Sequence, residues 1–370
     1  MNISFLLNRT GYVLQHLLML RHKPHTIQMP ITARCNSACK TCNIWKQHCN
    51  DNIPAEKLAE ILSQPFFSEV AGIGVNGGEP SLYPDIVGLL DSFKVLKKLK
   101  WISFISNGVI PRNTLDMLEK SRAVCREHHW KMNFTVSLDG VQDVDDEIRG
   151  VKGHYEHVIS LIQEIKSDMD RFCDVLNIGC TISKYNVCYL PEIDTVFKNL
   201  NVPVEYHLAV PNKRIYTFDD SGYSVLNSQR DTALAAEFFL RKYSESGSVS
   251  EKLRYWGNYH YLIHHGHRRP TECSWLLRDV TIDENLNMYL CATASDCIGS
   301  LRENKAAKII KSRTCKTIAK QIRNTCCDSC IHYSYTLSFR GIFAFALFYI
   351  KHSKWNLVFY NRFLRWLFSR

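Results

Sequence analysis

Six short apolar segments rich in β-branched residues alternate with helix-like stretches over the first two-thirds of the chain. Strands that alternate with helices at this spacing predict βα units and a parallel sheet. Six units indicate an α/β fold, a partial (β/α)6 TIM-like barrel, rather than a complete barrel of eight units. In such barrels the chemistry takes place at the carboxyl ends of the strands. The expected strands are residues 27–33, 70–76, 101–106, 132–138, 175–182 and 202–210, and the expected helices are 54–64, 86–98, 112–130, 155–170 and 189–200.

The chain has 370 residues, which leaves room for more than this barrel. We expect an N-terminal basic and apolar segment over 1–26, the barrel over 27–215 and a helical connector over 216–265. A small cysteine-rich domain over 266–335 and an amphipathic basic tail over 336–370 follow. Fifteen cysteines in a chain of this length indicate a reducing compartment, the cytoplasm, in which clustered cysteines bind metal.

The net charge of +10 lies in the two ends of the chain. Residues 1–34 hold four Lys or Arg, residues 331–370 hold six, and neither stretch contains an Asp or Glu. The body is therefore neutral, which argues against a basic groove for nucleic acid. Basic and apolar ends favour peripheral contact with the anionic inner face of a membrane. A helix pair that covers the barrel, or a dimer contact, explains the aromatic-rich tail equally well.

Three cysteines follow the first predicted strand directly, as Cys35, Cys39 and Cys42 in a C-x3-C-x2-C pattern. Three thiolates on one short loop can hold three irons of a cubane [4Fe–4S] cluster and leave the fourth iron open to a small molecule. A structural zinc site needs four protein ligands, and His48 and Cys49 could complete one. The triplet therefore predicts an iron–sulfur cluster, with zinc as the alternative.

With this triplet at this place, the chain resembles the radical SAM superfamily. The resemblance implies that the amino and carboxylate groups of S-adenosylmethionine (SAM) chelate the open iron. It also implies that an electron from the reduced cluster splits SAM into methionine and a 5′-deoxyadenosyl radical, which takes a hydrogen atom from the substrate. Thr41 departs from the pattern, because many members have an aromatic residue before the third cysteine.

Further motifs follow the later strands in the order that this family shows. The segment 77–80 resembles the family's GGEP motif, which implies contact with the amino group of SAM. Ser137 and Asp139 would lie near the ribose hydroxyls, and Arg149 could pair with a carboxylate. Each motif by itself could be a turn, a helix cap or a surface ion pair. The implied cofactor-binding residues are Gly77, Gly78, Glu79, Pro80, Ser106, Asn107, Ser137, Asp139 and Arg149.

Seven cysteines fall within the region 266–335. Cys273 and Cys291 flank seventeen residues that predict a β-hairpin, with strands over 280–282 and 288–290, and a C-x2-C pair follows later. This pattern resembles the twitch domain, a shortened relative of the SPASM domain. The resemblance implies one auxiliary [4Fe–4S] cluster held by Cys273, Cys291, Cys327 and Cys330, with Cys326 as a rival for Cys327. Cys297 and Cys315 stay unassigned, and we interpret Cys49, Cys125, Cys173, Cys180 and Cys188 as structural.

Together these patterns predict a radical SAM oxidoreductase. A cluster with four cysteine ligands has no open iron, and the resemblance implies that it accepts the electron left on the substrate after hydrogen abstraction. We expect a polar small-molecule substrate, such as a sugar, a cyclitol or a lipid-linked form of one, and an electron donor such as flavodoxin or ferredoxin.

A peptide- or protein-modifying radical SAM maturase is the alternative function. Only 34 residues precede Cys35, which is short for the leader-peptide recognition domain that many such maturases carry. A methyltransferase, an epimerase or a non-catalytic zinc scaffold also remain open. His207 and Tyr185 could line the substrate pocket, although a lone His or Tyr is more often a packed residue.

Overall fold

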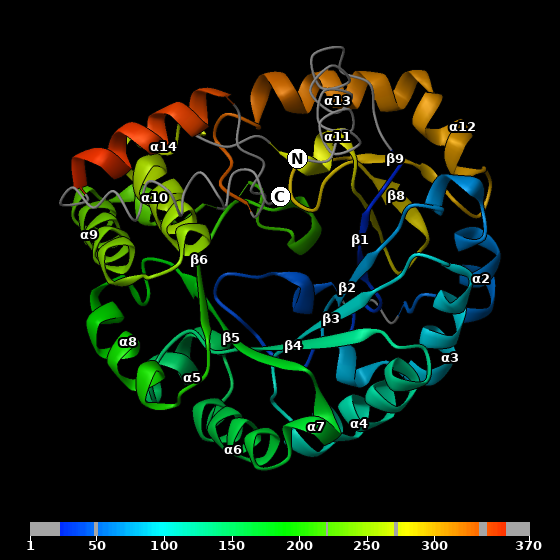
Figure 1. Cartoon of the computed structure of the whole chain (residues 1–370), viewed down its shortest axis with the longest axis horizontal. Helices are drawn as coiled ribbons and strands as arrows, with labels where there is room; N and C mark the ends of the chain where they lie inside the picture. The colour runs from blue at the N-terminus through cyan, green and yellow to red at the C-terminus, as the bar shows by residue number, and fades with distance from the viewer. Residues whose placement is uncertain (1–22, 48–50, 220, 270–272, 333–338, 353–370) are drawn as a thin grey trace, which may run out of the picture.

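A computed structural model describes residues 23–47, 51–219, 221–269, 273–332 and 339–352. Its centre is a curved sheet of nine strands in the order β6-β5-β4-β3-β2-β1-β7-β8-β9, surrounded by helices (Figure 1). Neighbouring strands from β1 to β6 are parallel, which confirms the predicted partial barrel. These strands are β1 (Thr26–Pro30), β2 (Gly72–Asn76), β3 (Trp101–Ser106), β4 (Lys131–Ser137), β5 (Val175–Ile182) and β6 (Val204–Leu208).

Helices connect these strands and cover the outer face of the sheet (Figure 1). The expected helix over 86–98 is shorter, because α3 gives way to a 3-10 turn at Ser92, whose hydroxyl donates to Leu89 O at 2.5 Å. A short helix before α6 was not predicted. The connecting helices are α2 (Ala55–Leu62), α3 (Ile86–Asp91), α4 (Pro111–Glu127), α5 (Asp143–Arg149), α6 (His154–Ser167), α7 (Met169–Phe172) and α8 (Leu190–Asn199).

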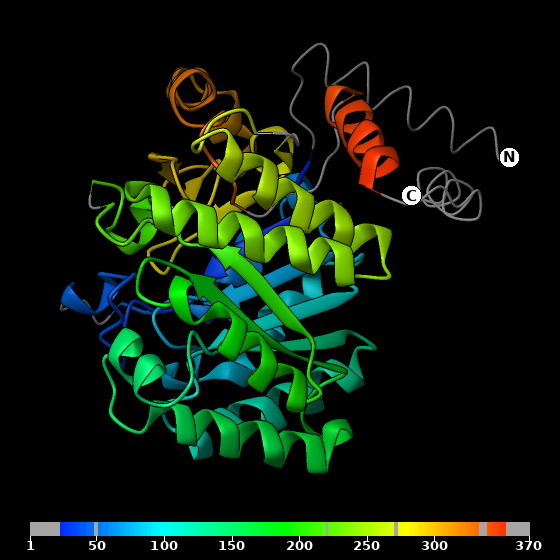
Figure 2. The ribbon, with the colours of Figure 1, turned by 90° about the vertical axis from the view of Figure 1, so that its left-hand side faces the viewer.

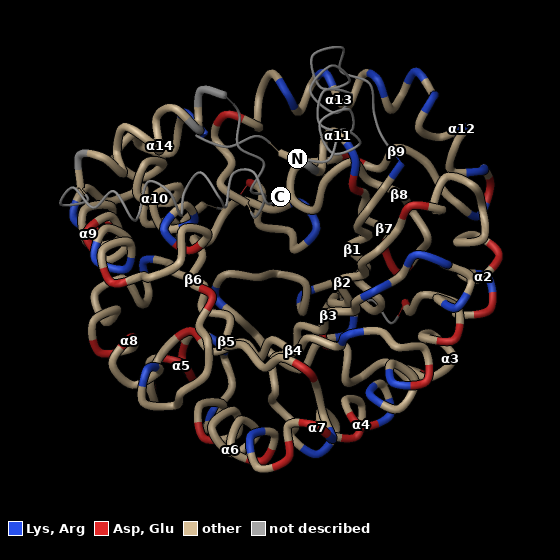
Figure 3. The backbone as a smooth tube through the Cα atoms, in the orientation of Figure 1, with Lys and Arg blue, Asp and Glu red and all other residues tan. Residues whose placement is uncertain are grey.

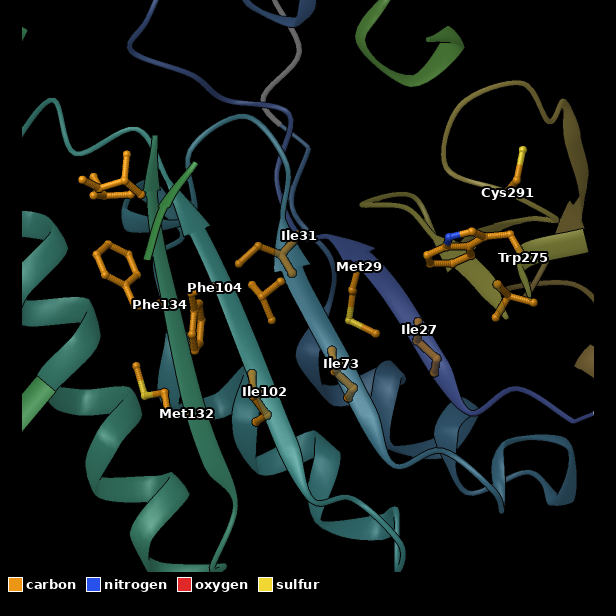
Figure 4. Packing of buried hydrophobic residues seen from close by; sticks show 14 of the residues in the cluster. Ile27, Met29, Ile31, Ile73, Ile102, Phe104, Met132, Phe134, Trp275 and Cys291 are labelled. Carbon is orange, nitrogen blue, oxygen red and sulfur yellow. The ribbon is translucent and has the colours of Figure 1, made fainter. Parts of the chain in front are cut away.

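The two faces of the barrel sheet differ in polarity. Apolar side chains on the outer face are buried against the helices, as Figure 4 shows for Ile27, Met29, Ile102, Phe104 and Phe134. The alternate positions point into the lumen of the barrel, and most of them are small or polar. The lumen positions, which lie beside one another on neighbouring strands, include Gln28, Gly74, Ser103, Asn133, Thr135, Asn177, Gly179, Thr181 and His207.

The cysteine-rich unit continues the barrel sheet instead of forming a sheet of its own. Strand β7 (Val280–Ile282) pairs in parallel with β1, and it forms the predicted hairpin with β8 (Asn287–Tyr289). At the start of β1, the backbone N–H groups of His25 and Thr26 both donate to the Asp279 carboxylate, at 3.1 and 2.9 Å. The remaining elements of this unit are α11 (Ser274–Leu277), β9 (Cys297–Ser300), α12 (Ala306–Lys311) and α13 (Arg313–Thr325).

The connector is helical, as expected, and consists of α9 (Gln229–Glu245) and α10 (Val249–Ile263). Helix α14 (Phe339–His352) lies over this pair at the edge of the molecule (Figure 2). Charges of both signs are spread over the surrounding helices (Figure 3). Within the described ranges, no helix combines the length and the apolar character needed to cross a bilayer.

Candidate active site

The three cysteines of the triplet lie together on the loop after β1. Each thiol is half-buried, and the Cys42 N–H donates to Cys39 O at 3.2 Å. Burial raises the pKa of Cys35 to about 11 and that of Cys42 to about 12, and the neighbouring thiolates add to both shifts. The thiols therefore stay protonated at neutral pH until iron replaces their protons.

Four buried donors around this loop have no hydrogen-bond partner among the residues that the structure describes. They are Arg34 Nε, Asn36 Nδ2, Ser37 Oγ and Arg149 Nε. A buried donor without a partner costs free energy, so such a set favours an acceptor that carries negative charge. Three thiolates and the sulfides of a cluster are acceptors of this kind, so the residues present fit the predicted cofactor.

Within the described ranges, no group of three or more His, Cys, Asp or Glu side chains could hold one metal ion. A cluster does not require such convergence, because each thiolate binds a different iron. His48 and Cys49, the two residues that could complete a zinc site, lie outside the described residues.

The end of helix α5 holds the cysteine loop in place. Ala38 N–H donates to Arg149 O at 3.1 Å, and Lys40 N–H donates to Ile148 O at 2.8 Å. Gly150 has a φ of +65°, and a Cβ there would lie 2.5 Å from Ala38 O. Glycine is therefore required at this position for two reasons. It adopts the left-handed backbone conformation, and it allows the close approach of the cysteine loop.

The predicted glycine motif packs against the segment that leads into Cys35. Gly78 N–H donates to Thr32 O at 2.8 Å, and Glu79 N–H donates to Arg34 O at 2.7 Å. A Cβ on Gly78 would lie 2.0 Å from Arg34 O. The glycine therefore allows two backbone segments to touch, a role separate from the predicted contact with SAM.

Glu79 is fully buried and accepts three hydrogen bonds. Its carboxylate accepts from Ser81 N–H at 2.9 Å, from Ser106 Oγ at 2.7 Å and from Asn107 N–H at 2.7 Å. Burial raises the pKa of Glu79, although these donors oppose the shift. The Ser81 hydroxyl opposes the shift as well, so the surrounding donors favour the charged carboxylate, the form that attracts an ammonium group.

Asn107 connects the cysteine loop to a buried ion pair. Its Nδ2 donates to Asn36 Oδ1 at 2.8 Å and lies 3.8 Å from Cys35 Sγ, while its carbonyl is 2.7 Å from His154 Nε2. His154 Nδ1 in turn contacts the Asp145 carboxylate. The imidazole therefore lies between the Asp145 carboxylate and the Asn107 carbonyl. Sequence reasoning missed His154 and Asp145.

Asp139 and Arg149 form an ion pair beside Cys39. Arg149 Nη2 lies 2.8 Å from Asp139 Oδ2, and Arg149 Nη1 lies 3.9 Å from Cys39 Sγ. Asp139 Oδ1 accepts from Thr181 N–H at 2.6 Å. The predicted carboxylate partner of Arg149 is therefore Asp139. The Asp139 carboxylate faces buried protein groups, whereas Ser137 occupies a partly exposed position on β4.

Five cysteines line one small cavity of the C-terminal unit, and Cys291 is labelled in Figure 4. Burial and the neighbouring charges of three other thiols, Cys273, Cys291 and Cys330, raise the pKa of Cys327 to about 12. The predicted ligand set is thus brought together. Cys326 also lines the cavity and lies 3.2 Å from Thr325 Oγ1.

Cysteines outside these two groups occupy other environments. Cys297 is exposed on β9 and Cys315 is buried in α13, and neither lines the cavity. Cys49 lies outside the described residues, and Cys188 is exposed. Those buried in the barrel core, as expected of structural residues, are Cys125, Cys173 and Cys180.

Residues 29–186 match the family model of the radical SAM superfamily. The chain contains a radical SAM domain over this range. A [4Fe–4S] cluster and SAM are the cofactors of such a domain, and the prediction of a radical SAM domain is confirmed.

Two curated relatives match parts of the chain. Pre-heme d1 synthase of Dinoroseobacter shibae is 26% identical over 170 residues, which cover 44% of this chain and 38% of that protein. Fe-coproporphyrin III synthase of Methanosarcina barkeri is 23% identical over 252 residues, 64% of this chain and 57% of that protein. The matches thus span less than two-thirds of either relative.

Two solved structures share the fold over most of this radical SAM chain. Native anSMEcpe with bound AdoMet and a peptide has a TM-score of 0.58 and 14% identity, covering 89% of this chain and 97% of that chain. SuiB from Streptococcus suis, bound to S-adenosylmethionine, has a TM-score of 0.55 and 15% identity, covering 85% and 71%. The shared fold therefore extends beyond the radical SAM domain into the cysteine-rich unit.

One short segment connects the two cysteine sites of this radical SAM chain. The 3-10 helix η6 (Lys213–Ile215) follows β6, and Ile215 O accepts from Asn43 N–H at 2.9 Å, next to Cys42. Lys213 N–H donates to Thr293 O at 2.7 Å, close to Cys291. The same few residues therefore position both cysteine loops.

His207 and Tyr185 lie near the open end of the barrel. His207 Nε2 is 3.1 Å from Thr181 Oγ1 in the lumen, and its ring is exposed. The surrounding barrel nevertheless removes water from the imidazole, and this burial lowers the pKa of His207. Tyr185 lies under Lys40 Nζ at 5.0 Å from the ring centre, so it borders the cysteine loop.

Proposed function

We propose that this radical SAM chain oxidises a polar small molecule, with a sugar or a lipid-linked sugar as the preferred class. The observation that carries this proposal is the polar lumen directly beside the three thiols and their unpartnered donors. When bound, the cluster supplies the electron that splits SAM into methionine and the 5′-deoxyadenosyl radical. The protein binds and orients the reactants and keeps water from the radical.

Cys35, Cys39 and Cys42 would hold the SAM-binding cluster. The donors Arg34 Nε and Arg149 Nε offer positively charged N–H groups to its thiolates and sulfides. Because the loop backbone already binds the end of α5, these donors are in place before the cluster arrives.

The SAM contacts would come from the ends of β2, β3 and β4. Glu79 would accept a charge-assisted hydrogen bond from the ammonium group, and Gly77, Gly78 and Pro80 shape the loop that carries it. The other predicted contacts have distinct tasks: Ser106 and Asn107 orient Glu79, Ser137 is available to the ribose, and Asp139 holds Arg149.

The lumen favours a substrate with many hydroxyl groups. Over the described strands β1 to β6, the lumen positions carry one acid, Glu205, and one basic residue, Lys131. Lys131 is the first residue of β4, at the end of the strand away from the cysteine loop. Hydroxyl and amide groups such as those of Ser103, Asn133 and Thr181 can bind a neutral polyol. A polycarboxylate such as a coproporphyrin would need basic side chains in the lumen to bind its carboxylates.

A peptide- or protein-modifying maturase is the second candidate. The likeness to anSMEcpe with a bound peptide and to SuiB bound to its precursor peptide favours it, although that likeness concerns the fold. A peptide can enter the lumen with one side chain, so a hydroxylated side chain would meet the same polar groups.

The auxiliary [4Fe–4S] cluster would be held by Cys273, Cys291, Cys327 and Cys330 and would accept the electron left on the substrate. This role makes the net reaction a two-electron oxidation. Cys327→Ser is expected to remove about four irons per chain, whereas Cys326→Ser should leave the iron content unchanged. The reverse result would assign Cys326 as the ligand.

Flavodoxin or ferredoxin is the proposed electron donor. Trp45 is 38% exposed beside Cys42, and Lys46 Nζ lies 5.3 Å from its ring centre. An exposed aromatic ring with neighbouring positive charge suits an acidic protein surface next to the cluster.

Anaerobic reconstitution tests the proposal. We expect about eight irons per chain and, with dithionite and SAM, formation of 5′-deoxyadenosine. Cys39→Ala should abolish this product, whereas Cys188→Ala, which changes an exposed cysteine outside both groups, should not. Deuterated hydroxylated compounds whose deuterium is transferred to 5′-deoxyadenosine would identify the substrate class. Deuterium transfer from serine- or threonine-containing peptides alone would favour the maturase, and zinc without sulfide would overturn the radical enzyme.

A further inference from the structure

Helix α14 has one face packed on the protein. Phe345 and Tyr349 are buried, and the Phe345 ring lies 5.2 Å from that of Trp256 on α10. Phe348 contacts the rings of Tyr243 and Tyr259 at 5.1 and 5.7 Å. These aromatic contacts hold α14 against α9 and α10.

The opposite face of α14 is apolar as well, but it is exposed. Phe343, Leu347 and Ile350 are 67%, 54% and 46% exposed. Their spacing of four and three residues places them in one stripe along the helix. Single exposed apolar residues are common on proteins, whereas a contiguous stripe on a packed helix indicates a surface that binds something.

The charge of the surrounding chain indicates what that surface binds. Residues 331–370 contain six Lys or Arg and no Asp or Glu, and residues 1–34 contain four and none. These two stretches account for the whole net charge of +10, so the rest of the chain is neutral. An apolar stripe within a purely basic stretch is complementary to a surface with an apolar interior and anionic groups.

We propose that the exposed face of α14 binds an anionic lipid bilayer. Phe343, Leu347 and Ile350 enter the boundary between headgroups and acyl chains, and the basic residues of the same stretch attract anionic headgroups. Phe345 and Tyr349 keep the barrel attached to the helix. This inference is independent of the radical chemistry, and it supplies the membrane contact that a lipid-linked substrate requires.

Flotation of the full-length protein with vesicles tests this inference. Vesicles of phosphatidylcholine with phosphatidylglycerol should carry the protein at low salt, and vesicles of phosphatidylcholine alone should carry much less. Replacing all three exposed residues by Ser should lower the vesicle-bound fraction at least about tenfold. The matched control is Tyr189→Ser, which changes an aromatic residue that is 43% exposed outside α14 and should leave flotation unchanged.

Two further measurements separate the alternatives. Phe343→Trp keeps an apolar residue suited to the interface, so it should float like the wild type even if the triple variant were poorly folded. Flotation of the folded triple variant at the wild-type level would overturn the proposal, as would the absence of flotation. Sedimentation that shows a dimer broken by the triple variant, without flotation, would assign the stripe to a second copy of the chain.

Discussion

Arg149 is a positive charge enclosed by protein, with Asp139 on one side and Cys39 on the other. The Asp139 carboxylate neutralises Arg149 before the cluster is bound, which limits the cost of burying the guanidinium group. Arg149 also gives its backbone carbonyl to the loop, at Ala38 N–H. One residue therefore contributes charge through its side chain and position through its backbone.

Gly150→Ala should lower the iron content of the triplet site as well as stability. Its matched control is Gly153→Ala. Gly153 also has a positive φ, +77°, but a Cβ added there would have its nearest neighbouring atom 4.0 Å away. Both variants should lose about 1–2 kcal/mol of unfolding free energy from the left-handed backbone. Only Gly150→Ala should also displace the cysteine loop, as measured by iron per chain. Equal iron in both variants would contradict the tight contact with Ala38.

Glu79→Gln should weaken SAM binding about tenfold while the iron content stays constant, because a charge-assisted hydrogen bond is lost. The carboxylate pKa is raised by burial, so lowering the pH through that value protonates it and removes the charge that attracts ammonium. Wild-type SAM affinity should therefore fall as the pH drops, and the variant should show no such fall. Glu147→Gln, at a 72% exposed acid paired with Lys40, is the control and should bind SAM normally.

At the scale of elements, the β7–β8 hairpin owes its shape to one carboxylate in its turn. Asp283 accepts from Asn285 N–H at 2.9 Å, from Asn287 N–H at 2.8 Å and from Tyr289 Oη at 2.8 Å. Arg214, in the segment that connects the two cysteine sites, lies 3.4 Å from the same carboxylate. The Asp283 carboxylate therefore contacts both the hairpin turn and the connecting segment.

Asp283→Ala should destabilise the protein by about 2–4 kcal/mol, since it leaves the buried donors of the turn without their acceptor and removes one of the two carboxylates beside Arg214. The measurement is chemical denaturation together with the iron content of the auxiliary site, which should fall. Asp296→Ala is the control, because Asp296 is 52% exposed and makes one ion pair, with Lys213 at 2.6 Å. Such a surface pair contributes at most about 1 kcal/mol. Similar losses in both variants would contradict the central role of Asp283.

At the scale of the whole molecule, the barrel and the cysteine-rich unit share one sheet. Strand β7 covers the edge of β1, and Asp279 binds the first two N–H groups of that strand. The sequence divides the chain into a barrel over 27–215 and a unit over 266–335, and this division stays a prediction. The shared sheet indicates that the two parts depend on each other for stability.

A chain that ends after residue 265 should therefore fail to fold as a soluble barrel. Removing β7 exposes the edge of β1 and leaves the His25 and Thr26 N–H groups without an acceptor. Size-exclusion chromatography should show aggregates, and the truncated chain should not retain the SAM-binding cluster. Full-length Cys291→Ser is the control, since it changes a proposed auxiliary ligand but keeps β7. A monomeric truncated barrel that unfolds cooperatively would show that the parts are independent.

Much of the fold and of the site could be read from local patterns. Alternating apolar segments placed the six barrel strands to within a few residues, because strand and helix periodicity are properties of short windows. The triplet at Cys35, Cys39 and Cys42 was readable for the same reason, since its ligands lie on one loop. The C-terminal cysteines were also predicted, with Cys326 as a rival for Cys327, and in the tertiary structure both line the cavity.

Contacts between distant residues were decided by the tertiary structure. Arg149 reaches Cys39 across 110 positions, and His154 reaches Asn107 across 47, so no short window contains either pair. Gly78 is required because another backbone segment passes next to it, and β7 joins β1 through sheet register. Sequence by itself therefore determined the radical SAM domain, the barrel and the cysteine triplet. Packing and register decided which buried charges and donors surround the cysteines, because these depend on which distant segments touch.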